Sequence, residues 1–146
     1  MINITVEGID KLKDVFKKAP EKAERAIKRA IQKSTMLILG KAKENIDKMT
    51  RTHTGFLKNK WEVKMTTFKS TLYPTMFYAP YVHEGTKAHI ILPVIKKALF
   101  WKGARHPVKK VHHPGTTARP FLRMAVENSI NRIKRFFKEE LEAIFK

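Results

Sequence analysis

The stretch that decides the fold is "PEKAERAIKRAIQKSTMLILGKAKENIDK", residues 20–48. Apolar or small residues recur in it at steps of three or four: Ala23, Ile27, Ala30, Ser34, Ile38, Ala42 and Ile46. This spacing places them on one side of an α-helix, with Lys and Glu on the other side. Pro20 suits the first turn, where its missing N–H would be unpaired anyway. The stretch therefore predicts a long helix near residues 20–48, whose alanines allow close packing within the chain or against another subunit.

The residues before this helix predict two shorter elements. Ile2, Ile4 and Val6 alternate with polar residues, which is typical of a strand. From Ile9 the apolar period becomes helical and predicts a short helix near residues 9–18. Pro20 would break a continuous helix, so the two helices are expected to be separate.

The middle of the chain predicts strands. Leu57, Trp61, Val63 and Met65 form the apolar face of the first one, after a turn at residues 52–55. Further strand patterns occur at residues 71–78, 88–92, 98–102 and 108–112. Pro74 confines the second strand to an edge or a bulge, because proline cannot donate to a ladder. The last two patterns predict a hairpin with a long tip.

The chain closes with "TTARPFLRMAVENSINRIKRFFKEELEAIF", residues 116–145. Its apolar stripe consists of Leu122, Val126, Ile130, Ile133, Phe137, Leu141 and Ile144. This spacing predicts one helix of about 25 residues, with Pro120 in its first turn. We therefore expect a single α+β domain over residues 1–146, in which helices pack on one face of an antiparallel sheet and a basic hairpin protrudes.

Composition narrows the classes of function. The chain has 146 residues and no cysteine, so neither disulfides nor thiolate metal clusters are expected. Thirty-one Lys and Arg against thirteen Asp and Glu give a net charge of +18, which favours an anionic partner. The N-terminal residues contain no basic region followed by an apolar one, and prolines interrupt the longest uncharged run, so we expect neither a signal peptide nor a membrane span.

The segment "YVHEGTKAH", residues 81–89, raises the question of a metal site. A zincin would need two histidines at i and i+4, but His83 and His89 are six apart and Gly85 lies between them. A turn is therefore favoured, with Tyr81 and Val82 as core anchors. We expect no metal, no cofactor and no catalytic residues, since phosphate loops and nucleophile elbows are also missing from the sequence.

The basic segment, "KKALFWKGARHPVKKVHH" at residues 96–113, is the strongest chemical signal. It contains three histidines, no acid and six cations: Lys96, Lys97, Lys102, Arg105, Lys109 and Lys110. We expect these cations to meet a protein partner or DNA through contacts that do not depend on sequence. A solvated loop that only keeps the sheet edge from aggregating is the alternative.

Three motifs together resemble the head-tail joining family of long-tailed bacteriophages, whose members are also called tail-completion, neck or minor tail proteins. The first is a helix ending in Ala-Lys-x-Asn that leads to a Thr-Gly-x-Leu turn. The second is Tyr-x-x-Tyr-Val-x-x-Gly-Thr, and the third is Ala-x-Pro-Phe-Leu-x-x-Ala. The matching residues are Thr54, Gly55, Leu57, Tyr78, Tyr81, Val82, Gly85, Thr86, Ala118, Pro120, Phe121, Leu122 and Ala125.

The resemblance implies a structural virion protein rather than an enzyme. Such a subunit joins the tail tube or its terminator to the head connector, within a homo-oligomeric ring that is often sixfold. It implies assembly in the cytoplasm of the bacterial host, from a phage or prophage, with passing contact with phage DNA and none with a membrane. The alternative from another class is an accessory protein that binds nucleic acid without sequence specificity, which the net charge alone suggests.

Overall fold

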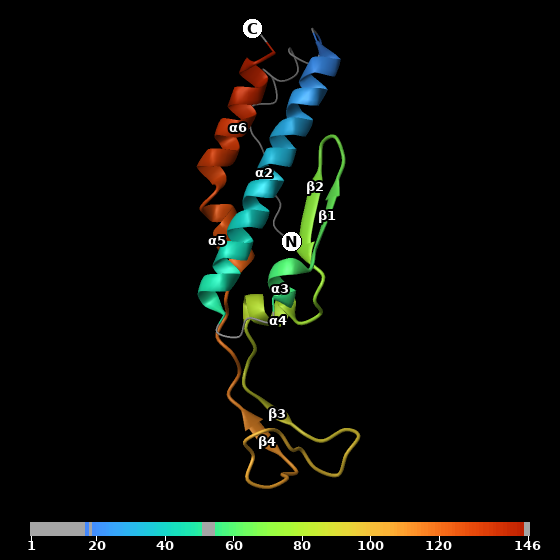
Figure 1. Ribbon diagram of the computed structural model, residues 1–146, viewed down its shortest axis with the longest axis vertical. Coiled ribbons are helices and arrows are strands. Elements are labelled where there is room, and N and C mark those ends of the chain that lie inside the picture. The colour runs from blue at the N-terminus through green and yellow to red at the C-terminus, as the bar shows by residue number, and fades with distance from the viewer. Residues whose placement is uncertain (1–16, 18, 51–54, 145–146) are drawn as a thin grey trace. The chain divides into compact units, whose positions relative to one another are not determined.

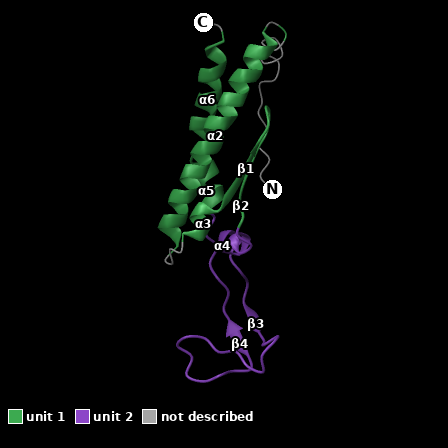
Figure 2. Cartoon of the chain, turned by 45° about the vertical axis from the view of Figure 1, so that its right-hand side comes forward, with its two compact units in different colours: residues 1–75, 121–146 green, residues 76–120 purple. Residues whose placement is uncertain are grey.

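The computed structural model in Figure 1 describes residue 17, residues 19–50 and residues 55–144. The predicted strand at residues 2–6 and, apart from Lys17, the predicted helix near residues 9–18 lie outside these described residues. The chain divides into two compact units, which Figure 2 colours separately. Unit 1 contains residues 1–75 and 121–146, and unit 2 contains residues 76–120.

Unit 1 is built around α2 (Pro20–Met49), which confirms the long helix predicted at residues 20–48. The residues that α2 buries are Ala23, Ala26, Ile27, Ala30, Ser34, Thr35, Ala42 and Ile46. Their spacing is that of one helical face, and their small side chains let α2 lie close along the C-terminal helices (Figure 1). The alanine face therefore packs within the chain.

The C-terminal segment forms two helices, α5 (Phe121–Glu127) and α6 (Ile130–Glu142), instead of the single predicted helix. The break falls at Asn128 and Ser129, two residue types whose side chains compete with helical backbone hydrogen bonds. The Ser129 N–H donates to the carbonyl of Val126, only three residues back, at 2.9 Å. This tighter turn separates the two helices.

The buried line of α5 also differs from the predicted stripe. Phe121, Ala125 and Ser129 are buried, whereas Leu122 is half-buried and Ile130 is 43% exposed. The residues that face α2 therefore lie one position before those of the predicted apolar stripe. The Ser129 hydroxyl is buried and has no hydrogen-bond partner among the described residues.

A buried carboxylate ties α6 to α2. Glu140 is 8% exposed, and its two oxygens accept hydrogen bonds from Arg29 Nε and Lys33 Nζ, each at 2.6 Å. The pKa of Glu140 is held below its ordinary value of 4.5, mainly by the hydrogen bond from Lys33. Burial raises this pKa, and the hydrogen bond from Arg29 lowers it further. Glu140 is therefore charged at neutral pH and links the two helices through both cations.

A second cluster joins α2 and α5 to the start of the first strand. Phe121, which is 2% exposed, meets the Trp61 ring edge-on with the ring centroids 6.1 Å apart. The Trp61 indole N–H donates to the carbonyl of Leu57 at 2.9 Å, and Asn45 Nδ2 donates to the carbonyl of Phe121 at 3.0 Å. These contacts hold α5 against the first strand and α2.

The predicted strand that includes Leu57 begins later than expected. Gly55, with φ 77°, precedes α3 (Phe56–Asn59), so Leu57 lies in a helical turn. Strand β1 (Trp61–Met65) follows and pairs antiparallel with β2 (Ser70–Pro74), with Trp61 opposite Pro74. Strand β2 ends at Pro74 rather than continuing to residue 78. Thr75 still donates to the carbonyl of Lys60 at 2.9 Å, but the Lys60 N–H donates to the carbonyl of Phe56 in α3, so the ladder does not continue.

Unit 2 contains α4 (Ala79–Glu84) and the short antiparallel strands β3 (His89–Ile91) and β4 (Val111–His113). Within the described ranges the strands form two separate two-stranded sheets, one in each unit, rather than one meandering sheet. Helices together with antiparallel strands confirm the α+β class. None of the described helices is both long enough and apolar enough to cross a membrane.

Candidate interaction surface

Two antiparallel chain segments of unit 2 meet at an isolated bridge between Thr86 and Thr116, which we call the crossing. Each backbone N–H donates to the carbonyl of the other residue at 3.0 Å, and the two hydroxyl oxygens are 3.1 Å apart. Beside this bridge, the Arg119 N–H donates to the carbonyl of Val82 at 3.0 Å. The crossing therefore joins the second motif of the sequence to the residues just before the third.

Glycine makes this close crossing possible. Gly85 has φ 75°, and a Cβ at this position would lie 2.5 Å from the carbonyl oxygen of Thr116. Gly115 has φ 89°, and a Cβ there would collide with the carbonyl oxygen of Thr86. Both the backbone angle and the space therefore require glycine at these two positions.

The histidines of the possible metal motif do not come together. His83 Nδ1 lies 2.6 Å from a carboxylate oxygen of Glu84, whereas the His89 ring stacks on His113 with the centroids 4.9 Å apart. The His113 Nδ1 accepts a hydrogen bond from the backbone N–H of Gly115 at 3.0 Å, and that nitrogen is therefore occupied. Among the described residues, no group of three His, Cys, Asp or Glu side chains is placed to hold a metal ion.

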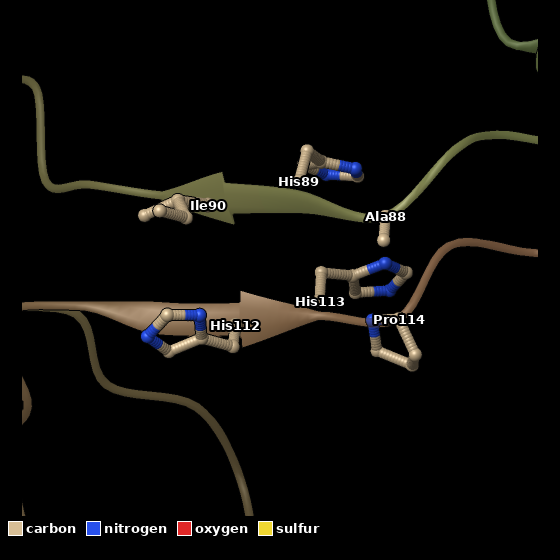
Figure 3. A pocket seen from close by; sticks show the side chains of 6 residues that line it. All are labelled: Ala88, His89, Ile90, His112, His113 and Pro114. Atoms are coloured by element: carbon tan, nitrogen blue, oxygen red, sulfur yellow. The ribbon is translucent and has the colours of Figure 1, made fainter.

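Strands β3 and β4 border an open hollow of about 350 Å³. Figure 3 shows the side chains that line it: Ala88, His89, Ile90, His112, His113 and Pro114. Its polar groups are imidazoles, and no carboxylate is among its lining residues. The hollow is thus an open depression in the sheet surface, whereas small ligands usually bind in enclosed cavities.

The basic segment has less regular structure than the predicted hairpin of residues 98–102 and 108–112. Leu99 and Val108 form an isolated bridge, with backbone hydrogen bonds of 2.7 and 3.0 Å. Strand β4 begins only at Val111 and pairs with β3. Gly103 and Pro107 lie between the bridge residues, where neither favours a continued ladder.

All six cations of the basic segment are exposed. Within the part of the chain that the structure describes, the ion pairs involve other residues and none of these six. Their positive charge is therefore left without an ion-pair partner among the described residues. The structure agrees with the expectation that they are surface residues, and contact with a partner or DNA stays a prediction.

Sequence reasoning missed the exposed apolar side chains beside these cations. We call five of them the apolar anchors: Leu92, Val94, Ile95, Phe100 and Trp101. Val94 and Ile95 are 95% and 97% exposed. The signal that could have found them is the run "IILPVI" at residues 90–95, where Pro93 prevents a continuous buried strand.

Among the other motif residues, Thr54 lies outside the described residues, and the rest flank or belong to the helices of the two units. Tyr78 precedes α4, Ala118 is exposed and Pro120 is half-buried. The prediction that Tyr81 is a core anchor is wrong, because this side chain is 61% exposed. Helical geometry explains the difference: the buried face of α4 holds Ala79, and a residue two positions later points to the other side.

Comparison with known proteins identifies a family. The family model described as "Bacteriophage HK97-gp10, putative tail-component" matches residues 10–85, just over half of the chain. This range includes α2, the first sheet, α4 and Gly85. Neither the curated proteins nor the solved structures that were compared gave a match. The resemblance drawn from the motifs is thereby confirmed, and the chain belongs to this family of bacteriophage tail components.

Proposed function

We propose that this phage tail component joins the tail tube to the head connector as a subunit of a ring, with residues 1–146 acting as one domain. One observation carries the proposal. Ala79 is the single buried residue among residues 76–120, all of which the structure describes. A unit with so little core of its own gains burial mainly from neighbouring molecules, as expected for a subunit that functions inside an assembly.

The chain offers two different kinds of surface for such an assembly. Unit 1 has a helical core with its own ion pairs, whereas unit 2 presents exposed cations and apolar anchors. Other parts of the surface would then make the head-to-tail contacts between copies, which close into a ring when the rotation between subunits allows it, and the cations and anchors of unit 2 stay exposed for a different partner. A sixfold ring is the arrangement that the resemblance to head-tail joining proteins favours.

We infer that the role is structural rather than catalytic, without a metal or cofactor. Membership of a tail-component family supports this inference. His83 and His89 support it as well, because their rings have separate partners, Glu84 and His113. The protein would belong to the virion and be assembled in the host cytoplasm with tail-tube, terminator and connector proteins.

Deletion of the gene tests the proposal directly. The expected result is an accumulation of DNA-filled heads and separate tails, which electron microscopy distinguishes from complete particles. Cryo-electron microscopy of wild-type particles should then locate the chain as a ring at the head-proximal end of the tail. Complete, infectious particles from the deletion strain, or a position at the distal tip of the tail, would contradict the proposed joining role.

A second candidate function is non-specific binding of nucleic acid, which the net charge of +18 and the exposed cations of the basic segment favour. Its test is the salt dependence of duplex DNA binding by the purified chain. Neutralising Lys102, Arg105, Lys109 and Lys110 to Gln should reduce the log-log slope by about 0.9 for each lost phosphate contact. An unchanged slope would exclude phosphate contacts by these four side chains.

A further inference from the structure

The apolar anchors and the cations of the basic segment are interleaved along residues 92–110 of unit 2, and we call them together the mixed surface. The anchors Leu92, Val94, Ile95, Phe100 and Trp101 are each more than half exposed. Lys96 and Lys97 follow Ile95 directly, and Lys102 follows Trp101, so charge and apolar surface alternate along the chain. Water-exposed aliphatic side chains release hydrophobic free energy only when another surface covers them. An apolar surface rimmed by charge is also the usual composition of a protein contact site.

The described part of the chain offers little acidic surface to pair with these cations. The carboxylates of unit 1 that the structure describes are mostly held by nearby Lys and Arg, as in the pairs Glu44–Lys41, Asp47–Lys58 and Glu140–Lys33. In unit 2, Glu84 is the one carboxylate in the sequence of residues 76–120. The described surface of a second copy of this chain therefore presents mainly paired carboxylates or further positive charge, which disfavours it as the occupant.

DNA could bind favourably to only some side chains of the mixed surface. Phosphates would pair with the cations, and Phe100 or Trp101 could stack on a base. Val94 and Ile95, the most exposed anchors, have no aromatic face, and a phosphate backbone offers them no apolar cover. A partner must therefore combine apolar surface with negative charge, a combination that protein surfaces provide.

We propose that the mixed surface docks on a different virion protein, in an apolar groove rimmed by Asp and Glu. Val94, Ile95 and the two aromatic anchors fill the groove, and the basic segment pairs with its acidic rim. The isolated bridge between Leu99 and Val108 holds the residues just before Leu99 near those just after Val108. This proposal rests on the proposed place of the chain in the virion and adds the chemistry of its partner.

Site-specific photo-crosslinking in assembled particles tests the docking. A phage with an amber mutation in this gene is complemented with the full chain carrying benzoylphenylalanine at position 95, and a second sample carries it at position 36. Both native side chains are exposed, Ile95 to 97% and Met36 to 56%, but Met36 lies on α2 in unit 1. After irradiation, mass spectrometry identifies the peptide joined to each position.

The expected result is that position 95 joins a peptide of another virion protein in which apolar residues adjoin Asp or Glu, and that position 36 does not join this peptide. Two paired variants, Val94→Ser with Ile95→Ser and Lys109→Gln with Lys110→Gln, should each lower the yield of infectious particles about tenfold or more. The control Met36→Ser should leave the yield within about twofold of wild type.

Several outcomes would overturn the docking proposal. Cross-links from position 95 to DNA, to another copy of this chain or to nothing, in particles that contain the chain, each contradict it. A wild-type yield from the Val94→Ser, Ile95→Ser variant does the same. Particles that lack the chain altogether would instead contradict the proposed joining function, so the two failures are distinguishable. Circular dichroism and melting of each purified variant check that the fold is retained.

Discussion

Replacement of Glu140 by Gln should destabilise unit 1 in a pH-dependent way. Glu140 accepts two charge-assisted hydrogen bonds of 2.6 Å, from Arg29 and Lys33, and is 8% exposed. Hydrogen bonds to charged groups contribute roughly 1.5–3 kcal/mol each when well shielded. The Arg29 and Lys33 side chains are 55% and 51% exposed, so water screens part of this interaction.

We therefore expect Glu140→Gln to lower the free energy of unfolding by about 2 kcal/mol at pH 7, because the amide removes the charge and one acceptor. In a chain of this length, that loss corresponds to a fall in Tm of roughly 6–8 °C. Urea denaturation followed by circular dichroism measures the free energy, and calorimetry measures Tm. Glu139→Gln is the matched control, because this neighbouring carboxylate is 54% exposed and its pair with Arg135 is long, at 3.4 Å.

The pH dependence distinguishes charge from shape. The pKa of Glu140 is lowered in the folded protein, so its stabilisation is present above the unfolded value, ordinarily 4.5, and is lost as pH falls through the folded pKa. The difference between wild type and Glu140→Gln should therefore shrink as pH falls from 7 to 3, because a protonated glutamic acid resembles glutamine. A loss below about 0.5 kcal/mol at pH 7, or a difference of equal size at both pH values, would refute this account of the ion cluster.

The remaining predictions concern packing and backbone. Phe121→Ala should cost roughly 3–5 kcal/mol in a urea melt and Leu122→Ala less, since only Phe121 is fully buried; equal losses would contradict the observed buried line. Ser129→Ala should stabilise by about 1 kcal/mol, because it removes a buried hydroxyl without a partner among the described residues, and a loss of stability would point to a hydrogen bond through water. Gly85→Ala should abolish hydrogen-exchange protection at the crossing, whereas Gly103→Ala, where a Cβ meets open space, should preserve it; protection retained in both would disprove the steric argument.

Local patterns predicted the parts of the fold that depend on one helical face or one local bend. Ala23, Ala30, Ala42 and Ile46 were placed on the buried face of α2 by spacing alone, and the structure buries all four. The same reasoning misplaced the buried line of the C-terminal helices by one position. The apolar stripe there is broad, and contact with α2 selects which part of it is covered. Propensity at Asn128 and Ser129 was a local signal for the break that periodicity concealed.

Long-range contacts lie beyond such patterns. Nothing near Glu140 in the sequence indicates that Arg29 and Lys33, more than 100 residues away, will bind its carboxylate. Composition did predict an exposed basic segment, because six cations without an acid avoid a core. It did not indicate that Leu92, Val94 and Ile95 would be exposed as well, since apolar runs usually signal burial.

The crossing in unit 2 divides the chain into positions under very different evolutionary constraint. Gly85 and Gly115 tolerate no side chain, because each faces the backbone of the opposite segment. Between these glycines, most side chains of residues 92–110 are exposed and can be exchanged without disturbing the fold. We therefore expect related phages to keep both glycines and to diverge between them, each lineage fitting this segment to its own assembly partner. Recombination between phages could replace the segment as a cassette, with the crossing as its boundary.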